Sequence, residues 1–248
     1  MNATFVLLDL RRITRNWSAM FFTAVLPTFF YLIFGATVDA KGADIGNGNV
    51  AMYVMITMAA YGAVLAATSV SANAAVERVQ GWGRQLGLTP LADSSFVAGK
   101  AVVAMSVAAI PVALTYALGV ATGARGSATA WALSALLALA GSSVFAVYGL
   151  LVGTAFQSEA SAGAASGSIV VFAFLGNLFV PLSGGLLAFA KFTPLYGYAA
   201  LARYPLTEGW LTDGSRDPLW LPIANVVVWT LVFGALATWF VRRGRERQ

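Results

Sequence analysis

The sequence contains no cysteine and no histidine, and both absences exclude whole classes of chemistry. Without cysteine no disulfide framework can form, and without either residue no Cys/His zinc site can form. Serine–histidine hydrolysis and the HExxH zinc motif are excluded for the same reason. Ser166 in "ASGS" and Ser183 in "SGG" therefore lack a histidine base, and we expect this chain not to be an enzyme.

Charge is also scarce, because only 10% of the 248 residues are charged while 59% are hydrophobic, and the mean hydropathy is +0.77. A soluble domain carries roughly 25% charged residues. A membrane-spanning helix needs about 20 mostly apolar residues to cross a hydrocarbon core of about 30 Å. The composition predicts an all-α integral membrane protein in which residues 1–248 form one transmembrane domain. We expect no nucleic-acid partner.

Several transport motifs are missing as well. The only "GK" pair, Gly99-Lys100, is followed by Ala101 and lacks the leading glycine of a phosphate-binding loop, so we expect no cofactor bound directly. No acidic or basic residue falls near the middle of an apolar run, which disfavours a proton- or sodium-coupled carrier. No charged ring or carbonyl-filter motif points to an ion channel.

Six apolar runs are predicted to span the membrane: residues 17–38, 50–75, 96–120, 127–156, 160–182 and 219–241. With both termini inside, the acids divide evenly, so the net charge of +5 falls on the inner side. Ten of the 15 basic residues then lie inside: Arg11, Arg12, Arg15, Arg78, Arg84, Lys100, Arg242, Arg243, Arg245 and Arg247. The positive-inside rule thus predicts a multi-pass protein with cytoplasmic N- and C-termini. Pro27, in the middle of the first run, is expected to kink its helix.

The N-terminal segment, residues 1–16, is predicted to form an amphipathic helix in the membrane interface. Val6, Leu10 and Ile13 are spaced to share one helical face with Trp17. Basic residues on other faces suit an anionic inner leaflet: Arg11, Arg12 and Arg15. The helix serves either as a simple anchor or as a docking surface for a partner.

Residues 76–91, "VERVQGWGRQLGLTPL", form a polar island between two apolar runs. Trp82 suits an interface anchor, because aromatic and arginine side chains are enriched at energetic centres of interfaces, and Pro90 would end the segment. One helical face would carry Val76, Val79, Gly83 and Leu86. The island is either a helix held by a cytoplasmic ATPase or an ordinary polar loop.

The fifth apolar run opens with the small residues "ASAGAASGS". Gly163 and Gly167 are four apart, a spacing that lets another helix approach closely. The partner helix would lie either within the same subunit or in a second one.

The segment 181–206 is apolar but interrupted, so no single straight helix accommodates it. Its interruptions are Pro181, Gly184, Gly185, Pro194, Gly197 and Pro205. It is either a pair of short helices that dip into the outer leaflet and return, or an amphipathic loop resting on lipid headgroups.

The order of these features resembles the membrane subunits of type-2 ABC transporters, over nearly the whole chain. The similar motifs are the basic N-terminus before "FFTAVLPTFFYLIFG", then "ERVQGWGRQLGLTPL", "GTAFQSEASAGA" and "FVPLSGGLLAF…TPLYGYAALAR". The resemblance implies a bacterial plasma-membrane exporter of a hydrophobic or amphipathic drug, antibiotic or lipid. It also implies a separate cytoplasmic ATPase that binds ATP and Mg²⁺, and a second permease, which is either a similar chain or, as we expect, an identical copy that makes a homodimer. The alternatives are a non-transporting membrane scaffold and an ion-coupled carrier.

The resemblance also implies roles for individual residues. Residues 76–91 would be the coupling helix, contacting the ATPase through Val76, Glu77, Arg78, Val79, Trp82, Arg84, Leu86 and Pro90. A second inner contact would use Gln157 and Glu159. The re-entrant outer gate, 181–206, would include Pro181, Gly184, Gly185, Pro194 and Tyr196. The substrate path between subunits would pass Phe22, Phe29 and Phe30, whose other interpretation is packing against lipid.

Overall fold

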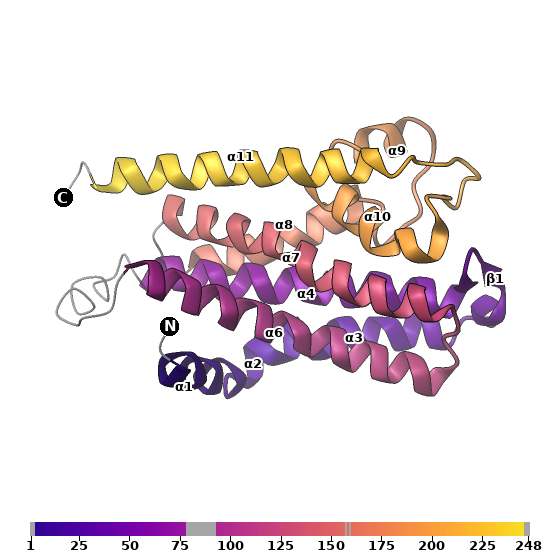
Figure 1. Cartoon of the computed structure of the whole chain (residues 1–248), viewed down its shortest axis with the longest axis horizontal. Helices are drawn as coiled ribbons and strands as arrows, with labels where there is room; N and C mark the ends of the chain where they lie inside the picture. Colours follow the sequence, from indigo (N-terminus) through magenta and orange to yellow (C-terminus); the bar gives the residue numbers. More distant parts are fainter. Residues whose placement is uncertain (1–2, 78–92, 157, 159, 246–248) are drawn as a thin grey trace.

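A computed structural model of the chain describes residues 3–77, 93–156, 158 and 160–245. Long helices lie side by side along one axis (Figure 1). One end, called the terminal end here, carries α1 (Ala3–Thr14) and the last turns of α11 (Trp220–Arg245). The opposite end, called the hairpin end, carries the antiparallel pair β1 (Asp44–Ile45) and β2 (Gly48–Asn49).

In the described part of the chain, four helices are long and apolar enough to cross a membrane. They are α4 (Val50–Glu77), α6 (Asp93–Thr122) over Gly99–Thr122, α7 (Ala128–Phe156) and α11 over Trp220–Val241. Two other expected spans form shorter apolar helices, Phe21–Ala36 and α8 (Ala160–Leu175). The chain is therefore an all-α membrane protein, as its composition predicts.

Helix α4 forms the centre of the bundle. In its most apolar stretch 83% of the residues are buried, against 11% in α11. Small side chains such as alanine are frequent along α4, so neighbouring helices can approach it closely from several sides. On α7, Gly149 and Gly153 pack against the carbonyl oxygens of Thr68 and Ala72, where an added Cβ would lie only 2.3 and 2.6 Å away. The close packing of α7 against α4 therefore uses a GxxxG spacing on α7.

The first expected span, 17–38, is not one uniform helix. It consists of α2 (Trp17–Met20), a π-helical segment η1 (Phe21–Val25), α3 (Leu26–Tyr31) and a second π-helical segment η2 (Leu32–Ala36). Proline has no N–H to donate and crowds the carbonyl four residues earlier. Pro27 lies at the start of α3, where the helix changes from π to α type, and the kink expected there stays a prediction. Pro27 and Pro111 of α6 meet at Gly62 of α4, where an added Cβ would lie 3.2 and 2.6 Å from their Cβ atoms.

The fifth expected span, 160–182, was predicted too long, because α8 ends at Leu175. Asn177 adopts a left-handed backbone with φ of 57°, a conformation that commonly ends helices. Its Oδ1 accepts a hydrogen bond of 2.8 Å from the Leu182 amide, which fixes the turn that follows.

Two short helices, α9 (Gly184–Ala190) and α10 (Pro194–Thr207), connect α8 to α11 on the side of the hairpin end (Figure 1). Near the start of α10, the Tyr198 hydroxyl lies 3.1 Å from the Ala60 carbonyl of α4 and 2.7 Å from the Ala138 carbonyl of α7. At its end, the Leu206 carbonyl accepts a hydrogen bond of 2.7 Å from Asn47 in the hairpin. Helix α10 therefore begins inside the bundle and ends at the hairpin end.

A Gly149→Ala substitution tests the close packing of α7 against α4. The new methyl group would meet the Thr68 carbonyl oxygen, which belongs to backbone and cannot rotate away. We expect a loss of about 1–3 kcal/mol in unfolding free energy, measured by thermal unfolding in detergent. Gly234→Ala in α11 is the control, because nothing described lies within 4 Å of its added Cβ. Equal stability of the two variants would contradict the packing described here.

Candidate functional site

An ionic network at the terminal end joins three helices. It consists of Asp9 and Arg12 of α1, Glu77 at the end of α4 and Lys100 of α6. Lys100 Nζ lies 2.7 Å from Asp9 Oδ2 and 3.0 Å from Glu77 Oε2. Arg12 pairs with the other oxygen of Glu77 and, at 3.2 Å, with Asp9. The network therefore links α1 to both helices that flank residues 78–92.

Among the described residues the network contains two acids and two bases, of which Asp9 and Lys100 are largely removed from water. The side chains of Asp9 and Lys100 are 8% and 11% exposed, while Arg12 is 53% exposed. Glu77 is the last described residue of α4, and its carboxylate pairs with Lys100 and Arg12 across helices. Because its core is buried, salt screens the network less than it screens surface pairs.

The apolar face of α1 packs against protein rather than standing free in an interface. Val6 is buried, and Leu10 and Ile13 pack on a cluster built from α4 and α6. Trp17 does not share this face, since it is 85% exposed, and that prediction is wrong. Helix α1 ends at Thr14, so Trp17 begins the next helix with a new orientation. The side chains of Arg11, Arg12 and Arg15 are exposed, as are Leu7 and Leu8.

The predicted coupling segment lies mostly outside the described residues. Of the predicted contacts, the structure describes Val76, which is buried, and Glu77. Those outside the described residues are Arg78, Val79, Trp82, Arg84, Leu86 and Pro90, and also Gln157 and Glu159 of the second inner contact. Their roles stay predictions.

The residues predicted for the outer gate do not form one cluster. Pro181, Gly184 and Gly185 are exposed, whereas Pro194 is buried in the first turn of α10. Tyr196 is fully buried and donates a hydrogen bond to Asp217. Lys191 Nζ lies 2.6 Å from the other Asp217 oxygen, so these three side chains tie the α9–α10 segment to the chain just before α11.

The loop between α10 and α11 is also fixed by hydrogen bonds. Ser215 donates from its hydroxyl and from its amide to Asp213 Oδ1, at 2.7 and 3.0 Å. These bonds, led by the one from the hydroxyl, lower the pKa of the Asp213 carboxyl. Arg216 lies over the ring of Trp210, 5.5 Å from its centre.

The two predicted packing glycines of α8 face open space. Nothing described lies within 4 Å of a Cβ added at Gly163 or Gly167. The structure thus places no helix of the same chain against them, and the intramolecular alternative is wrong for the described residues. The close contact within the subunit uses Gly149 and Gly153 instead.

The three predicted path residues separate into two environments. Phe22 and Phe29 are 60% and 52% exposed, on the outer surface of the first span. Phe30 is partly buried and packs edge-on against Phe179, with ring centres 6.2 Å apart. The exposed pair offers aromatic surface, while Phe30 belongs to the core.

The sequence predicts no partner for Asp9, Lys100 or Arg203, which the structure places in polar clusters. Each of them is a charged residue inside or beside an apolar segment. A charged residue needs a partner when it is buried, so this position in the sequence could have indicated the clusters. Among residues 3–77, 93–156 and 160–245, no group of three or more acidic, His or Cys side chains could hold a metal ion.

Comparison with known proteins gives one informative relative. A Bacillus subtilis (strain 168) protein named "Putative transport permease YvfS" is 21% identical over 243 residues. The match covers 96% of this chain and 95% of the relative, so the two are similar along their whole lengths. No protein-family model matches the sequence.

A Lys100→Met substitution tests the ionic network. It would leave the Asp9 and Glu77 carboxylates with Arg12 as their remaining cation, so we expect a loss of about 1–3 kcal/mol in unfolding free energy. Amide hydrogen exchange in α1 should also accelerate, because its tie to α6 is gone. Lys41→Met, at an exposed lysine of the hairpin end, is the matched control. If both variants behave alike, the network does not hold α1 in place.

Proposed function

We propose that this chain is the membrane-spanning subunit of an ATP-binding cassette exporter of the type-2 class. Two copies would form a homodimer in the bacterial plasma membrane, with a separate cytoplasmic ATPase bound to each. The substrate would be a hydrophobic or amphipathic molecule such as a drug, an antibiotic or a lipid. A relative named as a transport permease, similar over 96% of the chain, supports a role in transport.

The observation that carries the proposal is the ionic network at the terminal end. Residues 78–92 begin directly after Glu77 and end directly before α6, which carries Lys100. Both stems of that segment are bonded to α1 through Asp9 and Arg12. A force applied to residues 78–92 would therefore reach α1, α4 and α6 together. An inert loop needs no such connection.

The proposed topology has six spans and a cytoplasmic terminal end. The positive-inside charge pattern supports this orientation. The two shorter helices, Phe21–Ala36 and α8, are about 24 Å long at 1.5 Å per residue. Helix α2 lengthens the first of them, and the α9–α10 segment occupies the remaining depth beyond α8. Helices α9 and α10 would then be the re-entrant hairpin of the outer leaflet.

The proposed mechanism is a rigid-body rearrangement driven from the cytoplasm. ATP binding would close the two ATPase subunits and displace the coupling segments seated in them. Because packed helices shift as units, that displacement would move α4 and α6 relative to the second copy. The glycine stripe of α8 and the exposed Phe22 and Phe29 would lie toward that copy, where the substrate would pass.

Trp82→Ala tests the coupling segment. We expect about 30-fold weaker binding of the ATPase subunit, since a buried aromatic anchor contributes at least about 2 kcal/mol to an interface. Binding would be measured by co-purification of the complex, and ATP turnover would be assayed in parallel.

The control is Trp220→Ala, which removes an exposed tryptophan, 67% accessible, from the start of α11. If Trp82→Ala leaves both complex formation and ATP turnover unchanged, the scaffold alternative is favoured instead. Transport that survives ATP depletion but collapses with the proton or sodium gradient would favour the ion-coupled carrier.

A Gly163→Leu/Gly167→Leu double substitution tests the homodimer. Bulky side chains would keep a second helix at a distance, so we expect self-association in detergent to weaken by at least about tenfold. Size-exclusion chromatography with light scattering measures the dimer fraction. Gly234→Leu, also in open space, is the control. An unchanged dimer in the double variant would move the subunit contact away from α8.

A further inference from the structure

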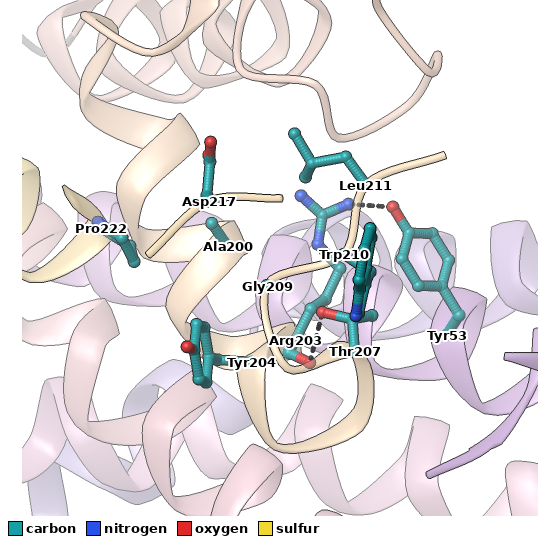
Figure 2. Close-up of a pocket in the computed structure, with 10 residues that line it drawn as sticks. All are labelled: Tyr53, Ala200, Arg203, Tyr204, Thr207, Gly209, Trp210, Leu211, Asp217 and Pro222. Atoms are coloured by element: carbon teal, nitrogen blue, oxygen red, sulfur yellow. Dashed lines mark hydrogen bonds between the residues drawn. The ribbon is translucent and has the colours of Figure 1, made fainter. Parts of the chain in front are cut away.

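A small pocket lies at the hairpin end, between the last turns of α10, the loop that follows it and the start of α11 (Figure 2). Arg203, Tyr53, Trp210, Leu211 and Asp217 are among its lining residues, and it is called the Arg203 pocket here. The pocket is small, with room for about one water-sized group. Trp210 is 52% exposed and Leu211 is partly buried, so this side of the pocket reaches the surface.

Arg203 is a buried cation with one terminal nitrogen that has no partner among the described residues. The residue is only 3% exposed. Nε donates to the Ala199 carbonyl at 3.1 Å, and Nη1 donates to the Tyr53 hydroxyl at 2.6 Å and to the Asn177 carbonyl at 3.2 Å. Nη2 has no hydrogen-bond partner among the described residues. Figure 2 shows the guanidinium bonded to Tyr53 on one side, while its other terminal nitrogen faces the space below Asp217 and Leu211.

The charge of Arg203 is not balanced by the nearby carboxylate. Asp217 lines the same pocket, but its two oxygens already bind Lys191 and Tyr196. The ion pairs described for the chain include none to Arg203, and the Tyr53 ring, 5.1 Å from its Cζ, offers only a weaker cation–π contact. A buried charged donor left unpaired is costly, so a ligand that supplies an anionic oxygen would be favoured.

We propose that the Arg203 pocket binds a phosphate-type oxyanion, with one oxygen inserted against Nη2 of Arg203. Arginine and phosphate form strong charge-assisted hydrogen bonds. The cavity has room for a single oxygen, so the rest of the phosphate would sit at the mouth beside Trp210. Trp210 and Trp220 are exposed at this end, as expected of tryptophans at headgroup depth. The phosphodiester of a membrane lipid is therefore one source of the oxyanion, and free phosphate is the other.

The site is independent of the proposed ATPase, and its test uses the full-length chain alone in detergent. After removal of bound lipid, the chain is titrated with phosphatidylglycerol, with diacylglycerol, which lacks the phosphate, and with inorganic phosphate. Thermal unfolding reports stabilisation, and native mass spectrometry counts bound lipid. Arg203→Gln removes the charge, and Ala200→Leu fills the pocket while keeping Arg203. Arg125→Gln, at an exposed arginine of the same end, is the matched control.

Phosphatidylglycerol should stabilise the wild type and Arg125→Gln, whereas diacylglycerol should not. Both pocket variants should need about tenfold more phosphatidylglycerol for the same effect, since a hydrogen bond to a charged group is lost. If inorganic phosphate alone gives the same Arg203-dependent shift, the oxyanion comes from solution. If Arg203→Gln does not fold, the comparison of phosphatidylglycerol binding between Ala200→Leu and the wild type tests the proposal. Binding that is equal in Ala200→Leu and wild type would overturn the proposal and leave the pocket to a water molecule only.

Discussion

Burial of α4 on every side is the constraint on which the rest of the structure depends. A membrane offers no water to backbone groups, so these groups are satisfied within the protein. Neighbouring helices approach one another closely where their side chains are small. Gly149 on α7 meets Thr68 of α4, and two prolines from other helices meet Gly62. Tyr198 of α10 reaches the Ala60 carbonyl. Helices α3, α6, α7 and α10 are thus positioned by a small residue or a carbonyl of the same central helix.

The polar chemistry of the chain gathers at the two ends of that central helix. Glu77 closes the ionic network at the terminal end, and Tyr53 holds Arg203 near the hairpin end. Asn49 caps the first turn, accepting a hydrogen bond of 3.0 Å from the Met52 amide, and fixes the helix to the neighbouring turn through Arg125. A displacement of α4 along its axis would disturb both polar regions together. In the proposed transporter this helix is the direct mechanical link between the coupling segment and the outer face.

The sequence predicts the membrane class and the long helices well, because length and apolar composition decide them. The runs 50–75 and 127–156 match α4 and α7 within two residues. Prediction from the sequence fails where the backbone conformation of one or two residues decides where a helix ends. Asn177 ends α8 early, and Arg15 and Asn16 separate Trp17 from α1. Such prediction also misses pairs distant in the chain, because Asp9 and Lys100 are 91 positions apart. Residue type alone does not tell which buried charge finds a partner.

The two glycine pairs of α7 and α8 show why spacing alone could not identify a contact. Gly149/Gly153 and Gly163/Gly167 have the same spacing, yet the first pair is packed against backbone and the second is open. Glycine costs about 1 kcal/mol relative to alanine in a helix interior. On α7 close packing against α4 offsets that cost. On α8 no described residue packs against the two glycines to offset that cost, and alanine would pack against lipid equally well. In the proposed homodimer a second helix approaching α8 would supply that compensation, but Gly234 of α11 is equally open, so an open glycine by itself does not identify a subunit contact.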